Sequence, residues 1–496
     1  MNDSSDSLIG EEMPSHRLAL TLTRRWWLVV GALSAMMALK LFWIVRLGSP
    51  TLELDALEYF QLGKSVADGD VWLEGHPIAY RTPAYPWLIG ICCRWTESSI
   101  MAMVIAQAML RWLTNVAAGV LAMQLAAPSR WAIWAVPMAM AMSLPTISSP
   151  IYVNVLLTET CFTVALTLHL IATLRYIRRP TVGAAMLVAI SLGWTILVRP
   201  IAMLLWLPHC MHCFATWFRN RTRPMQPTLS RLLMLGCLIA LVTSSMLAPW
   251  WMRNERLFGE RFLTMFVGRN LWIVTFQPES GAGLPIVPTT HSNALLKPMQ
   301  LTPKAANQMP MNDALQSWRH TWTTHRALIA AGFTDPQSDD QMKQVAMESA
   351  TASPRPFLWK AIRRIVNFWR TAATDLPVAE LEDDAVLTSR WLHRMIDARS
   401  SQSVALNTSV ILIALASLVR LAWIPASRDA AIWAGLILVY FQAITGILEI
   451  PDYRYRMVLE PLLTSILAAG VIGCIPWMLK KTETRAESVR QVGTND

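Results

Sequence analysis

Apolar runs of about twenty residues, separated by short polar stretches, recur along most of the chain. An α-helix rises 1.5 Å per residue, so about twenty apolar residues cross the hydrocarbon core of a bilayer. The pattern therefore predicts an all-α integral membrane protein with about ten spanning helices. Some of the runs are short, which indicates a thinned or cavity-lined region. The predicted spans are 26–45, 100–126, 131–144, 151–174, 182–198, 200–217, 232–250, 404–424, 430–448 and 457–479.

Composition supports this class of protein. Of the 496 residues, 54% are apolar and 15% are charged, whereas soluble proteins average about 25% charged residues. These values exclude a soluble enzyme, a disordered chain, a collagen and a nucleic-acid-binding domain. The seven cysteines lie mostly within or beside apolar runs, so they do not form a disulfide framework.

Basic residues in the short loops predict the orientation. The formal net charge is +10, and much of the excess lies at the ends of apolar runs, where it marks the cytoplasmic side. A cytoplasmic N-terminus places every short basic loop on that side, provided that the apolar stretch 84–93 does not cross. We predict that 84–93 is a short re-entrant or interfacial segment, packed on protein or lining a water-filled cavity. The loops concerned contain Arg130, residues 175–179, Arg219, Arg221, Arg223, Arg428 and Lys480 with Lys481.

The same topology divides the chain into five parts. They are a cytoplasmic N-terminus, a transmembrane module with the external loop 46–99, a large external region, a second transmembrane module and a cytoplasmic tail. At about 355–371, apolar residues recur at helical spacing with arginines and a lysine between them. This pattern is typical of a basic amphipathic helix that lies on the membrane surface. The five parts are residues 1–25, 26–251, 252–403, 404–479 and 480–496.

Two acidic positions are candidates for chemistry. On a helix Asp55, Glu58 and Tyr59 share one face, which gathers two carboxylates and a phenol at the membrane surface. A solvated polar face is the alternative. Glu159 lies eight residues into the span 151–174, roughly 12 Å from its outer end. Because a charge at that depth is costly, it should face a polar cavity or pair with an arginine such as Arg111.

Several short motifs follow one another in a recognisable order. Together they resemble the GT-C superfamily, most closely the branch of the dolichyl-phosphate-mannose protein mannosyltransferases and the lipid A aminoarabinose transferases. The resemblance covers most of the chain, except the middle of the large external region and the cytoplasmic tail. The motifs are Asp55 with Tyr59-x-x-x-Gly63, Ala67-x-Gly69, Arg81-x-Pro83-x-Tyr85-Pro86, Leu156-Leu-Thr-Glu159, Gly193…Arg199-Pro200, Pro249-Trp-Trp-Met-Arg253-Asn254, Pro356-Phe-Leu-Trp-Lys360…Asn367-Phe-Trp369 and Arg454-Tyr455-Arg456…Pro461.

The resemblance implies a glycosyltransferase that moves a sugar from a polyprenyl-phosphate donor by inverting displacement on the non-cytoplasmic face. Such a reaction needs a base for the acceptor nucleophile and cations for the leaving phosphate. We expect Asp55 to act as the base with help from Glu159, and a divalent cation at these two carboxylates is left open. For any single arginine, headgroup anchoring is the alternative. The expected phosphate ligands are Arg81, Arg199, Arg253, Arg454 and Arg456, supported by Glu58, Tyr59, Tyr85 and Tyr455.

The expected partners are the lipid bilayer, the polyprenyl-phosphate sugar and an acceptor lipid, glycan or protein, with no nucleic acid. No retention or transit signal is visible, which favours a bacterial inner membrane with a periplasmic active site. A transporter or flippase of a lipid-linked sugar and a non-catalytic envelope scaffold are the alternatives. The enzyme hypothesis requires Asp55, Glu159, Arg454 and Arg456 to surround one cavity.

Overall fold

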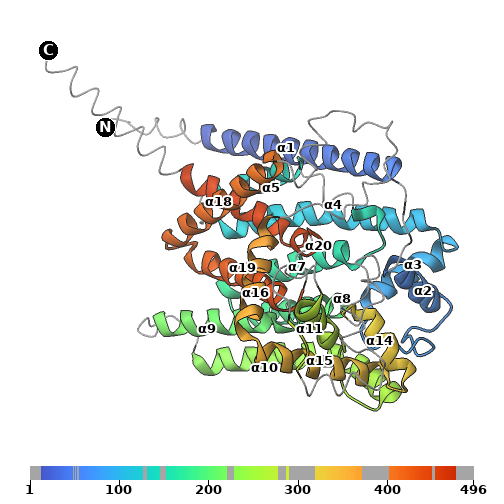
Figure 1. The fold of residues 1–496 in the computed structure, drawn as a ribbon. Coiled ribbons are helices and arrows are strands. Elements are labelled where there is room, and N and C mark those ends of the chain that lie inside the picture. Colours follow the sequence, from blue (N-terminus) through green and yellow to red (C-terminus); the bar gives the residue numbers. More distant parts are fainter. Residues whose placement is uncertain are drawn as a thin grey trace, which may run out of the picture.

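The chain forms an all-α structure. A computed structural model describes residues 13–48, 50, 52, 55–126, 131–145, 152–220, 228–277, 286–289, 319–370, 401–449 and 453–475. Every regular element in these ranges is a helix, and none of these residues forms a strand (Figure 1). The fold class predicted from the apolar runs is therefore confirmed.

Within the described ranges, five helices are long and apolar enough to cross a membrane. They are α1 (Met13–Leu47), α4 (Ile100–Leu125), α7 (Thr158–Arg178), α10 (Leu229–Phe258) and α19 (Arg428–Leu448). Five more apolar helical stretches among the described residues are shorter, at 10–17 residues, so each of the ten predicted spans contains an apolar helix. These five are Ala132–Ser143, Val182–Val198, Pro200–Ala215, Thr408–Trp423 and Glu460–Ile475. The first includes α5 (Ala135–Ser143), the second is α8, and the third joins η3 (Pro200–Leu205) to α9 (Trp206–Asn220). The fourth lies within α18 (Ser401–Trp423).

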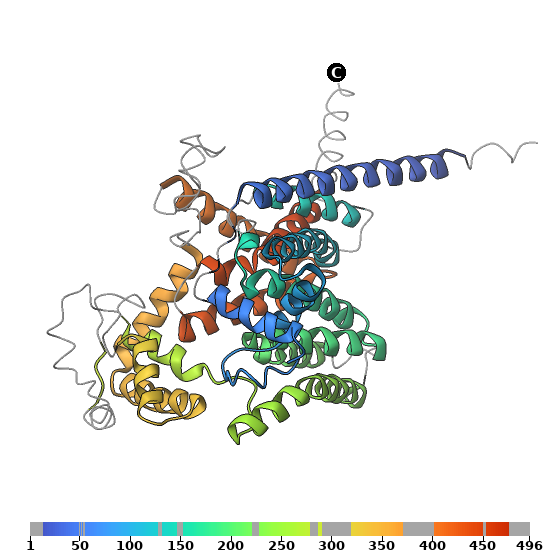
Figure 2. The ribbon, with the colours of Figure 1, turned by 90° about the vertical axis from the view of Figure 1, so that its right-hand side faces the viewer.

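The less apolar helices gather beside this bundle. In Figures 1 and 2, the hairpin of α2 (Asp55–Ala67) and α3 (Ala84–Thr96) lies at one end of α4 and α7. The helices of the large region between the two modules lie lower in Figure 1. They are α11 (Val267–Phe276), α14 (Thr321–Ala330), α15 (Asp335–Ala352) and α16 (Pro354–Arg370), and the short α20 (Tyr453–Met457) precedes the last apolar helix. Helices α11 and α16 pack on α19.

Helix α7 is the centre of the bundle. Of its most apolar stretch 78% is buried, and it packs against α4, α8, α19 and α20. Two of its threonines bond within the helix, since Thr163 donates to the carbonyl of Glu159 (2.6 Å) and Thr167 to that of Thr163 (2.7 Å). Thr173 instead pairs with His209 (3.0 Å) of another helix. These polar residues are tolerated in the core because each finds a hydrogen-bond partner.

The predicted span 151–174 begins later in the structure. Residues Tyr152–Asn154 form one 3₁₀ turn, η2, and Leu157 is extended (φ −124°, ψ 158°), so α7 begins at Thr158. Glu159 therefore lies in the first turn of α7, and the predicted depth of eight residues within a span is wrong. A carboxylate at this position also interacts favourably with the positive end of the helix dipole.

The stretch 84–93 is part of a regular helix, α3, that packs closely on α2. Two glycines allow the close approach. A Cβ atom on Gly63 would lie 2.2 Å from the Ile89 side chain, and one on Gly90 would lie 2.5 Å from that of Val66. The segment is thus packed on protein, as the sequence required of an apolar stretch that does not cross.

Helix α16 is amphipathic as predicted, but its basic residues do not all face outward. Lys360 and Arg364 are only 2% and 1% exposed. Lys360 donates to the carbonyl of Thr275 (2.7 Å) in α11, and Arg364 donates to that of Gly446 (2.7 Å) in α19. These two cations brace neighbouring helices, which corrects the picture of a uniformly basic outer face. The exposed side carries Arg355 and Arg363 together with the large apolar side chains of Leu358, Trp359, Ile362 and Val366.

Candidate active site

A cavity of about 680 Å³ lies where the apolar helices of both halves of the chain meet α2, α11, α14 and α20. This volume is in the range of ligand pockets in proteins. Six charged residues lie on its wall, three arginines and three carboxylates, and they come from both ends of the chain. They are Asp55, Arg81, Glu159, Arg199, Glu449 and Arg454.

The first charged group centres on Arg81. Its Nη2 atom lies 2.7 Å from Asp55 Oδ1, its Nε atom donates to Glu58 Oε2 (2.9 Å), and its Nη1 atom donates to the Tyr59 hydroxyl (3.1 Å). Tyr80 also donates to Glu58. The predicted face of Asp55, Glu58 and Tyr59 on α2 therefore exists, and all three side chains hydrogen-bond to Arg81. Of the five residues Glu58 alone is not on the cavity wall and lies behind Arg81.

Asp55 is the carboxylate that contacts arginines from both halves of the chain, Arg81 and Arg454. Its Oδ2 atom lies 3.8 Å from Arg454 Nη1, and its side chain is 40% exposed. Burial alone would raise the pKa of Asp55, but the charge and hydrogen bond of Arg81, together with Arg454 and Arg199, hold this pKa below its usual value. Asp55 is therefore anionic at neutral pH and is open to a ligand in the cavity.

The second pair is formed by Glu159 and Arg199. The distance between Arg199 Nη1 and Glu159 Oε1 is 3.0 Å, and the Glu159 side chain is nearly buried. Arg111, considered above as a structural partner, instead lies 3.3 Å from Glu460. The guanidinium of Arg199 also stacks over the ring of Tyr455 (5.3 Å). Glu159 and Arg199 thus form an ion pair on the cavity wall.

Arg253 was expected to bind phosphate, but the structure gives it a different role. It is fully buried and is not on the cavity wall. Its guanidinium is committed to the backbone that leads to Tyr80 and Arg81, so it fixes this loop in place. It donates to the carbonyls of Trp72 (3.1 Å), Leu73 (2.5 Å), His76 (3.0 Å) and Ile78 (3.1 Å).

Two other expected site residues also lie off the cavity wall. Arg456 donates to the carbonyl of Trp369 (3.1 Å), and Tyr85 donates from its hydroxyl to Gln107 (3.0 Å) behind the ring of Tyr59. The expectation that Arg456 faces the cavity beside Arg454 is therefore wrong, because α20 turns the two side chains apart. Tyr455 does line the cavity, and its hydroxyl accepts from Arg454 Nη2 (3.1 Å).

Glu449 is a site residue that sequence analysis missed. It directly follows α19 and accepts a hydrogen bond from Asn270 Nδ2 (3.3 Å). Burial raises the pKa of Glu449 more than the nearby charges of Arg199 and Arg454 lower it, so the net shift is upward. The available signal was an acidic residue directly after the apolar run 430–448. The arginines singled out from the sequence also lie at the ends of apolar runs.

An aromatic wall, formed by Tyr80, Phe266 and Trp322, faces the same cavity and was also missed. The ring of Tyr80 lies 5.6 Å from each of the other two rings. Behind it the buried Arg269 stacks on Tyr80 (4.6 Å) and pairs with Asp335 (2.7 Å). The region between the transmembrane modules thus builds one side of the site.

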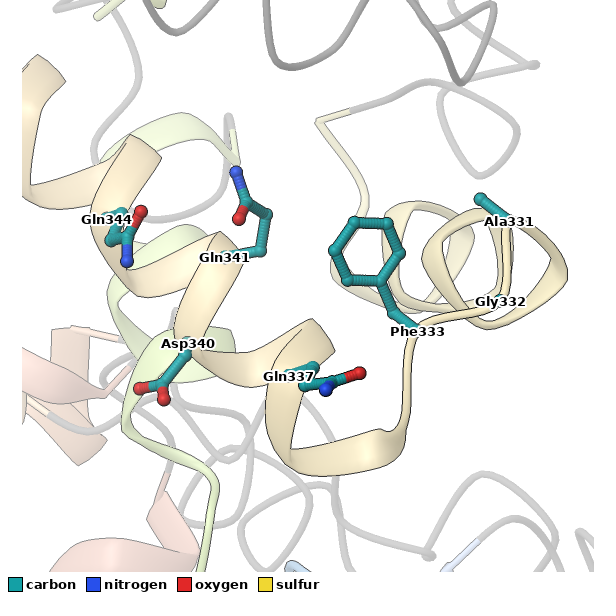
Figure 3. Close-up of a pocket in the computed structure, with 7 residues that line it drawn as sticks. All are labelled: Ala331, Gly332, Phe333, Gln337, Asp340, Gln341 and Gln344. Carbon is teal, nitrogen blue, oxygen red and sulfur yellow. The ribbon is translucent and has the colours of Figure 1, made fainter.

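A second hollow, of about 410 Å³, lies between the end of α14 and the outer face of α15 (Figure 3). It shares no lining residue with the charged cavity. Asp340 is the one charged residue on its wall, so it lacks the opposed acids and cations of the first site. The lining residues are Ala331, Gly332, Phe333, Gln337, Asp340, Gln341 and Gln344.

The carboxylates do not form a metal site in this arrangement. Among the described residues, no three side chains of His, Cys, Asp or Glu lie close enough to hold an ion. Asp55 and Glu159 are each paired with an arginine, so a divalent cation between them would have to displace both guanidinium groups. This donor set does not fit the cation that the sequence left open.

Known proteins offer distant comparisons. The sequence matches no described family and no curated protein. The structure is similar to the archaeal oligosaccharyltransferase AglB from Archaeoglobus fulgidus, solved with an inhibitory peptide and a dolichol-phosphate (11% identity, TM-score 0.47). The match covers 94% of this chain and 52% of AglB, so the chain spans about half the length of that protein.

The structure is also similar to ArnT from Cupriavidus metallidurans bound to undecaprenyl phosphate (14% identity, TM-score 0.36, 90% of this chain and 77% of that one). The apo state of the same ArnT gives 12% identity and a TM-score of 0.36, with 91% and 78% covered.

Proposed function

We propose that the chain is a membrane glycosyltransferase that moves a sugar from a polyprenyl-phosphate donor to an acceptor hydroxyl in this cavity. The observation that carries the proposal is the contact of Asp55 with Arg454 beside the pair of Glu159 and Arg199. A carboxylate poised next to several guanidinium groups is the arrangement that such a displacement needs. We place the reaction on the periplasmic face of a bacterial inner membrane.

The donor phosphate binds between Arg199 and Arg454. These guanidinium groups lie over the ring of Tyr455, at 5.3 and 5.0 Å from its centre. Two guanidinium groups on a shared aromatic ring form a rigid clamp for phosphate oxygens. The adjoining wall is apolar and suits the start of a prenyl chain, with Ile201, Met203, Leu204, Ile444 and Leu448 on η3 and α19.

The acceptor hydroxyl approaches from the side of Asp55 and the aromatic wall. Its oxygen forms a bond to the anomeric carbon as the bond from that carbon to the phosphate oxygen breaks, so the configuration inverts. The electron pair leaves on the phosphate, where Arg199 and Arg454 stabilise the added charge. Because Arg81 holds the pKa of Asp55 low, Asp55 first accepts a hydrogen bond and takes the proton only as the hydroxyl becomes acidic.

The remaining groups position these residues. Glu159 holds Arg199 at the cavity wall through the 3.0 Å ion pair. Glu58 and Tyr59 hold Arg81, which in turn orients Asp55. A pre-oriented set of charges costs little reorganisation when the leaving group develops its charge.

Conversion of Asp55 to asparagine tests the proposal. The full chain is placed in nanodiscs with synthetic undecaprenyl-phosphate hexoses and pentoses and a membrane extract as the source of acceptors, and release of undecaprenyl phosphate is measured. We expect Asp55→Asn to lower turnover by about 10²-fold or more with an unchanged melting temperature. Asp340→Asn, on the outer face of α15 with a 47% exposed side chain, is the matched control.

Two results would overturn the assignment. Wild-type turnover in folded Asp55→Asn would remove Asp55 as the base. Movement of an intact undecaprenyl-phosphate sugar between leaflets, without release of its sugar, would identify a transporter.

A further inference from the structure

The charges on the cavity wall balance. Three arginines, Arg81, Arg199 and Arg454, face three carboxyl groups, Asp55, Glu159 and Glu449. If all six are ionised, the wall has no net positive charge with which to bind an anion. A phosphate transferred from water into such a site would lose its hydration without a matching gain in electrostatic attraction to the wall. The proposed donor site therefore requires one carboxyl group to lose its charge.

Glu449 differs from the other two carboxyl groups in its partners. Asp55 and Glu159 each lie within 3.0 Å of a guanidinium nitrogen. The contacts of Glu449 that the structure describes are with uncharged groups, the Asn270 amide at 3.3 Å and the Tyr455 hydroxyl. A carboxyl group with neutral partners in a buried position is the one that is most easily neutralised by a proton.

The position of Glu449 places it beside the proposed phosphate clamp. It lies on the same cavity wall as Arg199, Arg454 and Tyr455, and the two arginines act on it electrostatically. Arg364, in the neighbouring α16, directs donors to the carbonyls of Gly446 and Val274. The titratable and charged groups that act on Glu449 are Glu159 from α7, Arg199 between α8 and η3, and Arg454 and Tyr455 from α20.

We propose that Glu449 takes up one proton when a lipid phosphate binds between Arg199 and Arg454, and releases it when the phosphate leaves. This inference rests on the proposed function. The anionic carboxylate becomes a neutral acid, so the negative charge that the phosphate brings replaces the one that Glu449 gives up. The protonated group can then donate a hydrogen bond to a phosphate oxygen instead of repelling it. Glu449 thereby makes lipid-phosphate affinity depend on pH.

The sign of this dependence follows from linkage. At low pH Glu449 is already neutral and the phosphate binds to a wall with excess positive charge. As the pH rises through the titration range of Glu449, binding must be accompanied by proton uptake, and the affinity falls by up to tenfold per pH unit. The phosphate titrates as well, with a second pKa of about 6. Comparison of wild type with a variant at position 449 separates the contribution of the Glu449 side chain to the pH dependence of binding from that of the phosphate.

The test measures binding of undecaprenyl phosphate to the full chain in phosphatidylcholine nanodiscs between pH 5.5 and 8.5. We expect Glu449→Gln to bind about tenfold more tightly than wild type at the upper end and to lose the part of the pH dependence that Glu449 causes. Glu449→Asp, which keeps a titratable group, should retain a pH dependence and serves if the glutamine variant does not fold. Glu255→Gln, at a 41% exposed side chain paired with Arg261, should follow wild type.

Each outcome decides the matter. If wild type binds undecaprenyl phosphate and Glu449→Gln gives the same affinity with the proton-linked part unchanged, this inference fails while the proposed function stands. Where Glu449→Asp has to be used in its place, loss of the pH dependence in that titratable variant has the same consequence. If wild type does not bind undecaprenyl phosphate at any pH, both fail. A parallel titration with inorganic phosphate separates the source of the anion. Equal affinity for the inorganic ion would show that the site takes free phosphate and would overturn the lipid part.

Discussion

Replacement of Arg253 by methionine tests whether this arginine holds the loop or a ligand. Methionine keeps much of the bulk of the side chain and removes its charge and donors. Five acceptors lose their partner: the carbonyls of Trp72, Leu73, His76 and Ile78 and the side-chain oxygen of Asn254.

The cost can be estimated from these contacts. A hydrogen bond to a charged group contributes about 1.5–3 kcal/mol, so the five bonds of Arg253 contribute roughly 8–15 kcal/mol before other costs. The burial of the cation offsets several kcal/mol of this gain. We therefore expect Arg253→Met to destabilise the protein by about 3–5 kcal/mol, the range seen when one side of a buried charged network is removed.

The effect on the site should be indirect. The loop held by Arg253 leads to Tyr80 and Arg81, which orient Asp55, whereas the proposed phosphate clamp is built by other elements. We expect hydrogen exchange of residues 72–81 to accelerate and turnover to fall at least tenfold. The affinity of the folded fraction for undecaprenyl phosphate should stay within about threefold of wild type, since 1.4 kcal/mol corresponds to a factor of ten.

Arg256 provides the matched control in the same helix. It is 63% exposed and pairs with Glu74 at 2.7 Å, so Arg256→Met should cost less than about 1 kcal/mol. The reasoning would be refuted if Arg253→Met melted like wild type but bound undecaprenyl phosphate tenfold more weakly. Arg253 would then be the phosphate ligand that the sequence pattern indicated.

Two further predictions concern the region between the transmembrane modules. A Cβ atom on Gly268 would lie 1.8 Å from the carbonyl oxygen of Asp339, so Gly268→Ala should destabilise the packing of α11 on α15 by about 3 kcal/mol or more, measured as faster proteolysis and a lower melting temperature. Burial lowers the pKa of Lys360 to about 8, with added repulsion from Arg364 and Arg319. Between pH 8 and the ordinary value of 10.5 the unfolded lysine binds more protons than the folded one, so stability should rise with pH in this window. Lys360→Met should abolish this rise of the free energy of unfolding with pH. If the variant shows the same rise as wild type, the pH dependence belongs to another group.

Elements defined by local signals could be predicted from the sequence. Residues 182–198 were predicted and α8 has the same bounds, because Thr181 caps its first turn and Pro200 cannot continue the helix. The start of α7 could not be predicted in this way. A 3₁₀ turn and an extended residue precede it, and the carbonyls of Val153 and Val155 in this segment accept from Gln107 on α4. A contact between distant segments, invisible to apolar periodicity, decides where this helix begins.

The candidate site shows the same difference between features set by local signals and features set by contacts between distant segments. The common face of Asp55, Glu58 and Tyr59 follows from spacing within one helix, and it is present. Glu449 was missed because an acid at the end of an apolar run carries no local sign of what it will face. Its partners, Asn270 and Tyr455, come from α11 and α20.

Arginines at the ends of apolar runs show why a sequence pattern alone cannot locate an anion site. Arg199, Arg253 and Arg454 occupy equivalent positions in the pattern, yet Arg253 meets neutral carbonyls and the other two meet carboxylates on an open wall. A phosphate can replace a carboxylate beside a guanidinium, because one anion is exchanged for another. It cannot replace a buried carbonyl without leaving that group unsatisfied. An arginine is therefore available to phosphate when its partner is a charged group on an open wall, and around this cavity Arg199 and Arg454 meet that condition.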